Sequence, residues 1–325
     1  MWLFRKESEE DKQQKLRQQE AVDALNRGEI PPIAKERILR ENARGKNFFS
    51  SDLTCREYLL VKEAGIQTVG QVMGTAFYKV GFWGFFNRYR NSTGEVAEVS
   101  KALTNARMAA VERMRQEAEL LGASGVIGVR INMKRHSWAD NLTEFTAFGT
   151  AVRLPDWKPG TPAFTSTLNG QEFWQLYRAG YRPEGIVMGA CAYYLHMDWN
   201  TRRAIYGWFS PNQELPTFTD GYRQAAKLAD LRLKEDLALH KADGAVGVII
   251  DPGEETIEYE INDTSYYDIL LNYVILGTAV SAHPEMEQKH PSPLLCLNLS
   301  SKTYGRLGST DDTDWEYYDK FYGGE

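Results

Sequence analysis

The stretch Ala123-Ser124-Gly125-Val126-Ile127-Gly128-Val129 returns later in the chain as Ala242-Asp243-Gly244-Ala245-Val246-Gly247-Val248, at an offset of 119 residues. Both versions are short, rich in β-branched residues and preceded by a region of helical periodicity, so each predicts a strand that follows a helix. A sequence pattern that recurs at such a distance indicates a repeated structural unit.

Two further blocks repeat in the same order. Phe49-Ser50-Ser51-Asp52-Leu53 is echoed by Phe164-Thr165-Ser166-Thr167-Leu168 at an offset of 115, and Gly149-Thr150-Ala151-Val152 returns as Gly277-Thr278-Ala279-Val280 at an offset of 128. Offsets that grow along the chain are typical of insertions in loops around a kept scaffold. We therefore interpret the chain as one unit duplicated in tandem.

Each copy predicts the same series of elements. A short element near 53–64 and 168–179 ends at Gly65 or Gly180, and a strand follows at 70–78 and 185–194. A long helix comes next, with an apolar face at Val111, Met114, Ala118 and Leu121 in the first copy. Strands at 126–131 and 144–152, and at 245–250 and 267–280, close the two units.

The predicted fold class is α+β: two tandem two-layer β-α-β-β units, each with an antiparallel or mixed sheet and one long helix, preceded by a helical N-terminal arm. The boundaries we predict are a charged arm at 1–47, a first domain at 48–155, a Pro-rich linker at 156–162, a second domain at 163–282 and an acidic, aromatic tail at 283–325. Open sheet edges in such units need partners.

Composition excludes several classes of protein. The 325 residues carry a net charge of −6, which argues against a nucleic-acid partner. No apolar run reaches the roughly 18–20 residues of a membrane helix. The three cysteines, Cys55, Cys191 and Cys296, are odd in number and far apart, which favours reduced thiols and a cytoplasmic location.

The stretches 106–118, 121–130 and 144–152 together resemble the YbjQ family, also labelled the "putative heavy-metal-binding domain". The first copy matches well, and the second is a diverged version. The resemblance implies a dodecin-like subunit that assembles into a ring, typically five-fold, without a firmly assigned activity. Two copies per chain imply either two tiers of five chains, which the short Pro-rich linker favours, or a ring in which the copies alternate.

Metal and catalytic chemistry find weak support in the sequence. Metal sites need Cys, His or carboxylates at convergent spacings, and only His283, Glu285, Glu287 and His290 cluster as weak candidates, in a segment that also reads as a solvated linker. Glu57 and Glu172 recur in both copies with no histidine nearby, and a capping box between Thr54 and Glu57 explains the first better than catalysis does. The sequence indicates no particular cofactor and no enzymatic activity.

Aromatic loops are the candidate contact surfaces. We predict subunit packing for them, with contact to lipid or to another protein as the alternative; the residues are Phe82, Trp83, Phe85, Phe86, Trp199, Trp208 and Phe209. The tail carries docking candidates for a protein partner, with folding back onto its own ring as the alternative: Trp315, Tyr317, Tyr318 and Phe321.

The resulting hypothesis is a non-enzymatic homo-oligomer, a five-fold ring that acts as a scaffold or adaptor. The alternative is a metal- or small-molecule-binding module whose sites form between subunits.

Overall fold

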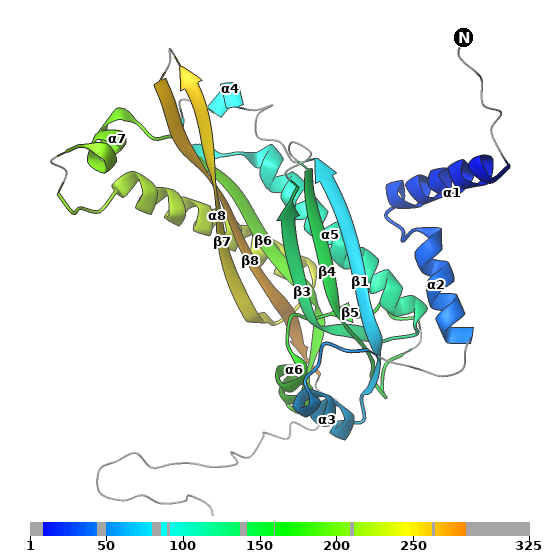
Figure 1. Cartoon of the computed structure of the whole chain (residues 1–325). Helices are drawn as coiled ribbons and strands as arrows, with labels where there is room; N and C mark the ends of the chain where they lie inside the picture. Colours follow the sequence, from blue (N-terminus) through cyan, green and yellow to red (C-terminus); the bar gives the residue numbers. More distant parts are fainter. Residues whose placement is uncertain are drawn as a thin grey trace, which may run out of the picture.

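The computed structural model describes residues 9–43, 50–79, 86–89, 92–136, 142–158, 160–208, 211–261 and 264–283. Two four-stranded sheets form the body of the molecule, each with one long helix, and two helices stand at the N-terminal side (Figure 1). The α+β class and the tandem β-α-β-β units predicted from the sequence are confirmed.

The first copy contributes one short helix, one long helix and three long strands. Their bounds are α3 Cys55–Glu63, β1 Gln67–Lys79, α5 Ala97–Leu120, β3 Gly125–Arg135 and β4 Leu142–Arg153. Between β1 and α5 lie the one-turn helix α4 (Phe86–Tyr89) and the short strand β2 (Gly94–Glu95).

The second copy repeats this series. Its elements are α6 Gly170–Arg178, β6 Tyr181–Leu195, α7 Trp199–Tyr206, α8 Pro216–Leu239, β7 Gly244–Ile261 and β8 Thr264–Ala282, preceded by the short strand β5 (Phe164–Thr165). The β7–β8 hairpin is longer than its counterpart in the first copy and longer than the sequence pattern predicts, since β7 continues past Ile250 to Ile261. Antiparallel pairing with β8, which extends to Thr264, carries the strand through Pro252 and Gly253.

The strand order is β1-β4-β3-β5 in one sheet and β2-β6-β8-β7 in the other. The main pairs are antiparallel, and the pair β3–β5 is parallel. The register shifts at matched places in both sheets, between Ile127 and Arg130 and between Val246 and Ile249. Gly128 and Gly247 sit there with positive φ, which a residue with a Cβ rarely adopts.

Local sequence signals explain the ends of the short helices. Thr54 caps α3 and forms the predicted capping box with Glu57, and Asn169 forms the same box with Glu172 in α6. Each helix is followed by a glycine in the left-handed region, Gly65 or Gly180. The two repeated glutamates therefore have a structural role at helix N-termini.

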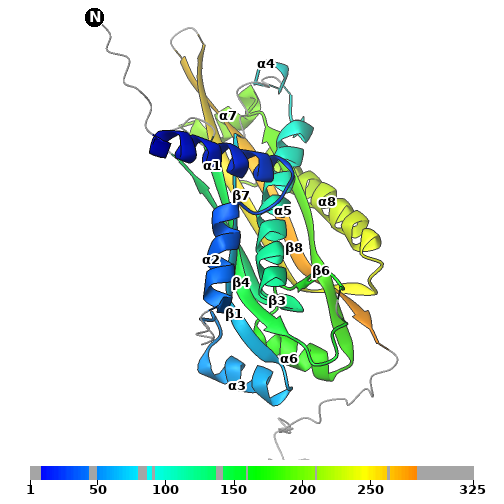
Figure 2. The same ribbon diagram turned by 90° about the vertical axis from the view of Figure 1, so that its right-hand side faces the viewer.

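The N-terminal helices α1 (Glu9–Asn26) and α2 (Pro32–Ala43) confirm the predicted helical arm, and Gly28, with positive φ, lies between them. They lie on the side of α5 and β1 that faces away from the second copy (Figure 2). Side chains fix this contact: Gln116 of α5 accepts from Ile30 N–H and donates to the Gly28 carbonyl, and Arg37 pairs with the buried Glu117.

The main core runs across both copies. It joins α5 residues such as Leu103 and Met114 to Phe145 of β4 and, from the second copy, to Ile186 and Tyr194 of β6. α8 packs on the opposite face of the second sheet, with Ala229 and Leu233 against Val187 and Leu271. The predicted two-layer units would have one covered face per sheet. The second sheet is instead covered on both faces, because α5 of the first copy lies on the face opposite α8.

Candidate assembly interface

The junction between the two copies is built by strand exchange. β5, from the second copy, adds a parallel strand to β3 of the first sheet. Phe164 N–H donates to the Ser124 carbonyl, Ser166 N–H to that of Val126, and Val129 N–H to that of Ser166. The Phe164 ring lies on Gly125, where an added Cβ would meet ring carbons at 2.4 Å. Glycine is thus required at that point of the repeated stretch.

The exchange is reciprocal, since β2 of the first copy pairs with β6 of the second sheet. Val96 N–H donates to the Ala192 carbonyl at 2.9 Å, and Ala192 N–H donates to Ser100 Oγ at 2.9 Å. Ser100 in turn donates to Glu95 at 2.8 Å. These bonds satisfy the backbone groups that an edge strand would otherwise leave open.

Glu95 also accepts from Arg232 of α8 at 2.5 Å, and the same arginine donates to the Ala190 carbonyl at 2.7 Å. The Glu95 carboxylate of the first copy therefore pairs with the half-buried Arg232 guanidinium of the second copy. Charge-assisted bonds of this kind are roughly twice as strong as neutral ones.

Each long helix binds the first long strand of its own sheet, β1 or β6, through an Arg and an acid spaced four residues apart. In the first copy Arg113 donates to the Thr75 carbonyl at 2.5 Å and Glu117 accepts from Met73 N–H at 2.6 Å. In the second, Arg232 and Asp236 make the matching bonds to Ala190 and to Met188 N–H.

Sequence reasoning missed this device, although the Arg-x-x-x-acid spacing recurs at the offset of 119. An arginine and an acidic residue four positions apart on a helix suggest an ion pair with each other. Only the structure shows that both side chains reach the adjacent strand.

A buried polar cluster lies at the top of the second sheet. Asp268 is almost fully buried and accepts from Met197 N–H at 2.7 Å and from the Tyr194 hydroxyl, with His196 Nδ1 at 3.2 Å. Burial, and then the bond to Asp268, raise the pKa of Tyr194. With these partners in place the carboxylate holds a loop to the strand, which is a structural role.

The predicted metal candidates stay unsupported where they can be seen. His283 uses its backbone N–H to bind the Gly180 carbonyl at 3.0 Å, and Glu285, Glu287 and His290 lie outside the described residues. Within the described ranges no group of three His, Cys, Asp or Glu side chains is close enough to hold a metal ion.

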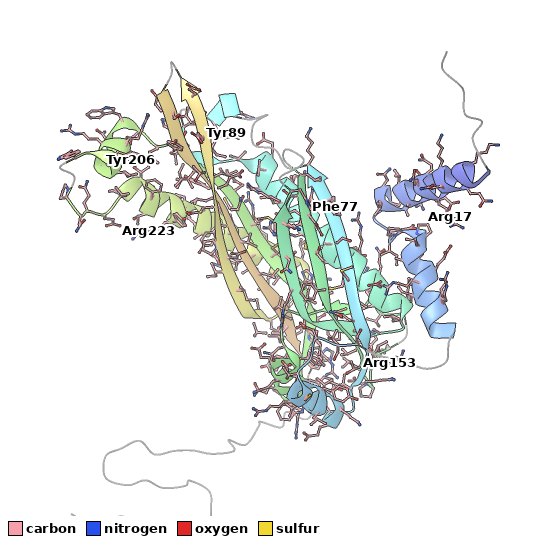
Figure 3. The ribbon with its side chains drawn as sticks, in the orientation of Figure 1. Arg17, Phe77, Tyr89, Arg153, Tyr206 and Arg223 are labelled. Carbon is pink, nitrogen blue, oxygen red and sulfur yellow. The ribbon has the colours of Figure 1, made fainter. Side chains whose placement is uncertain are left out.

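The aromatic candidates of the second copy are partly visible. Trp199, the first residue of α7, is 65% exposed, and Trp208, two residues after α7, is 93% exposed. The exposed Tyr206 ends α7, at the end of the molecule far from the first sheet (Figure 3). Arg203 stacks over the Trp199 ring at 5.3 Å. The remaining candidates fall outside what is described: Phe82, Trp83, Phe85, the side chain of Phe86, Phe209, and the tail residues Trp315, Tyr317, Tyr318 and Phe321.

No described helix combines the length and the apolar composition that crossing a membrane requires.

The fold defines a tandem protein of two α+β units, and comparisons with known proteins show its family. The model of the YbjQ family, described as "Putative heavy-metal-binding", matches residues 58–155. The chain is 32% identical over 277 residues to the encapsulin nanocompartment protein Rv1762c of Mycobacterium tuberculosis, an alignment that covers 83% of this chain and 98% of the relative. The chain belongs to the YbjQ family.

Shorter relatives align with one part of the chain. UPF0145 proteins of Halorubrum lacusprofundi and Thermotoga maritima are 49% and 44% identical over 61 residues, which is 19% of this chain and 57% and 56% of those proteins.

Proposed function

We propose that the chain is a non-enzymatic scaffold that assembles with copies of itself into a closed ring. The observation that carries the proposal is the strand exchange at the junction. One copy of the fold already completes the sheet edges of another, and a contact between unlike surfaces repeats until it closes into a ring or runs on as a filament.

The strand exchange supports alternation of the two copies around the ring over the two-tier arrangement, because they already occupy neighbouring positions. The five-fold count stays a prediction from the family resemblance. In an alternating ring, five chains supply ten copies of the fold.

A protein shell is the partner class we propose. The relative from Mycobacterium tuberculosis is named as an encapsulin nanocompartment protein, and the similarity covers most of both chains. We assign the docking role to the tail, whose aromatic residues 315–322 stand in an acidic sequence, and we place the protein in the cytoplasm.

Native mass spectrometry of the protein purified without added metal tests this function. The expected result is one closed oligomer with no additional mass. A monomer would contradict the scaffold, and an oligomer with a fixed adduct per chain would put the metal- or small-molecule-binding module first. A chain that lacks residues 303–325 is expected to keep its assembly and to lose co-purification with a shell protein.

A further inference from the structure

Within the part of the chain that the structure describes, nothing covers the outer edge of the second sheet, whereas the matching edge of the first sheet is covered. Val129 of β3, under the exchanged strand, is 3% exposed, whereas its match in β7, Val248, is 46% exposed. Ile249 and Ile250 beside it are more than half exposed. Exposed β-branched residues on an edge strand are a template for pairing with another strand.

The segment that would fill this edge exists in the first copy. Residues 50–53 match 165–168, which form the exchanged segment at the junction. Ser166 is fully buried there, while its match Ser51 is partly exposed.

The segment is already held in the geometry that docking requires. Asp52 N–H donates to Thr150 Oγ1 at 3.1 Å, as Thr167 N–H donates to Thr278 Oγ1 at 2.9 Å. Little ordering is needed when a segment that is already held in place pairs with an edge.

At the opposite end of the molecule, the edge strand of the first sheet is also exposed. β1 is an edge strand whose Met73 and Phe77 are 55% and 56% exposed, while the matching Met188 and Ala192 of β6 are buried against α5 and β2. Met73, Thr75 and Phe77 line a groove of about 1020 Å³ that the N-terminal helices flank.

Arg113 in this groove has fewer partners than its match. Arg232 binds a backbone carbonyl and the Glu95 carboxylate, whereas Arg113 binds only the Thr75 carbonyl among the described residues. Its Nε is buried and has no hydrogen-bond partner among those residues. In the described ranges no carboxylate takes the place beside Arg113 that Glu95 takes beside Arg232.

The start of α8 carries that carboxylate. Glu214 and Thr219 match Glu95 and Ser100, and Thr219 Oγ1 donates to Glu214 at 2.8 Å, as Ser100 does to Glu95. Glu214 is exposed, while Leu215 is only partly buried where its match Val96 is fully buried. The local geometry of the junction is thus preformed at the free end of the second copy.

Building on the proposed scaffold function, we propose that a second copy of this chain occupies both open edges at once. Residues 50–53 of one chain add a strand to Gly244–Val248 of the next, and the start of α8 of that next chain enters the groove on β1. Glu214 then pairs with Arg113, Leu215 N–H donates to the Phe77 carbonyl, and Phe77 N–H donates to Thr219. The contact joins unlike surfaces, in the same order as the contact inside the chain.

One difference between the copies sets how closely the contact is reproduced. Gly170 of α6 lies against α3, where an added Cβ would come within 2.7 Å of Glu57 Cβ. Cys55 stands at the matching place in α3. The helix pair between chains must therefore be slightly wider than the pair inside the chain.

Val248→Lys tests the β7 edge. Val248 is already half-exposed in the isolated chain, so a lysine is tolerated there, but docking would bury its charge without a partner. We expect the dissociation constant between chains to rise at least a hundredfold in sedimentation at several concentrations. Leu231→Lys is the control: Leu231 is an equally exposed apolar residue, and its match Glu112 pairs with Arg115 away from the junction.

A cross-link reports the register directly. Ser50 and Ala245 match Thr165 and Val126, which are paired across the exchanged strand. In a chain with Cys55 and Cys296 replaced by serine, Ser50→Cys together with Ala245→Cys is expected to form disulfides between chains on oxidation, seen as multiples of the chain mass on a non-reducing gel. Neither single substitution should do so.

The outcomes separate this interface from the scaffold itself. A wild-type monomer would contradict the scaffold function. A wild-type oligomer that survives Val248→Lys, or that gives no cross-link with the paired cysteines, would overturn the interface and leave the scaffold standing.

Discussion

The two copies have the same secondary structure but differ in burial wherever they face outward. Val96 and Ser100, at the start of α5, are buried, and their matches Leu215 and Thr219, at the start of α8, are partly exposed. The reverse holds for the first long strand of each copy, since β6 is buried on both faces and β1 on one. Identical elements thus acquire different surroundings from their neighbours in the chain. The contrast teaches that each copy has two contact surfaces. One, at the start of its long helix, adds to a neighbouring sheet, and the other, on its first long strand, receives such an addition.

Substitutions at the contact between the long helix and its strand should destabilise the two copies equally, because this contact lies inside each copy. The long helix of each copy crosses β1 or β6 at a glycine. An added Cβ at Gly189 would lie 1.9 Å from the Ala229 carbonyl oxygen, and one at Gly74 would lie 2.1 Å from that of Ala110. We expect Gly189→Ala to lower the free energy of unfolding by about 3 kcal/mol, because helix and strand must separate. Urea denaturation measures the effect.

Gly70→Ala is the matched control, since an added Cβ there meets no atom within 4 Å. Equal stability of Gly189→Ala and Gly70→Ala would show that helix and strand approach each other less closely than described.

Substitutions at the surface where one copy meets another should lower stability more at the junction inside the chain than at the free end of the second copy. Ser100→Ala leaves the buried Ala192 N–H without its acceptor and is expected to cost about 1–3 kcal/mol of protomer stability. Thr219→Ala removes a partly exposed hydroxyl and is expected to stay within about 0.5 kcal/mol of its parent. Both are measured by urea denaturation in the Val248→Lys background, so that assembly does not contribute. Equal losses would contradict the asymmetry of the two ends.

At alkaline pH we expect a smaller effect, on the free energy of unfolding, that comes from the second sheet and not from the first. Cys191 of β6 is buried, and burial raises the pKa of its thiol from an ordinary value near 9 to about 12. The unfolded chain therefore loses this proton at lower pH than the folded chain, and the contribution to stability falls as pH rises from about 9 to about 12. Ala76 stands at the matching position of β1.

Cys191→Ala should accordingly weaken the decline of the unfolding free energy between pH 9 and 11. The comparison needs denaturant titrations at each pH for both chains. Parallel declines would mean that the thiol titrates alike in the folded and unfolded states.

Much of the fold could be predicted from the sequence because its signals are local. The three repeated blocks mark the strands, the spacing of Val111, Met114 and Ala118 marks the buried helix face, and Thr54 with Glu57 marks a helix start. The full length of β7 could not be predicted, because Pro252 and Gly253 resemble a turn. Proline is accepted there since β7 is an edge strand, which can leave a backbone position without a donor.

The candidate interface shows the other limit. Ser50, Glu214 and Arg113 carry no motif that names a partner, and residues 94–95 and 164–165 are too short to be recognised as strands. Their meaning depends on which edge lies beside them, and that is a contact between residues far apart in sequence.

The sequence alone determined that the protein is a duplicated α+β unit, because periodicity, capping and glycine positions act over a few residues and recur with the repeat. Only the tertiary structure decided that each copy completes a sheet of the other, that α5 lies between two sheets, and that one edge of each sheet stays open in the described part of the chain. Those facts depend on the distances between backbones brought together by folding, and no local pattern encodes them.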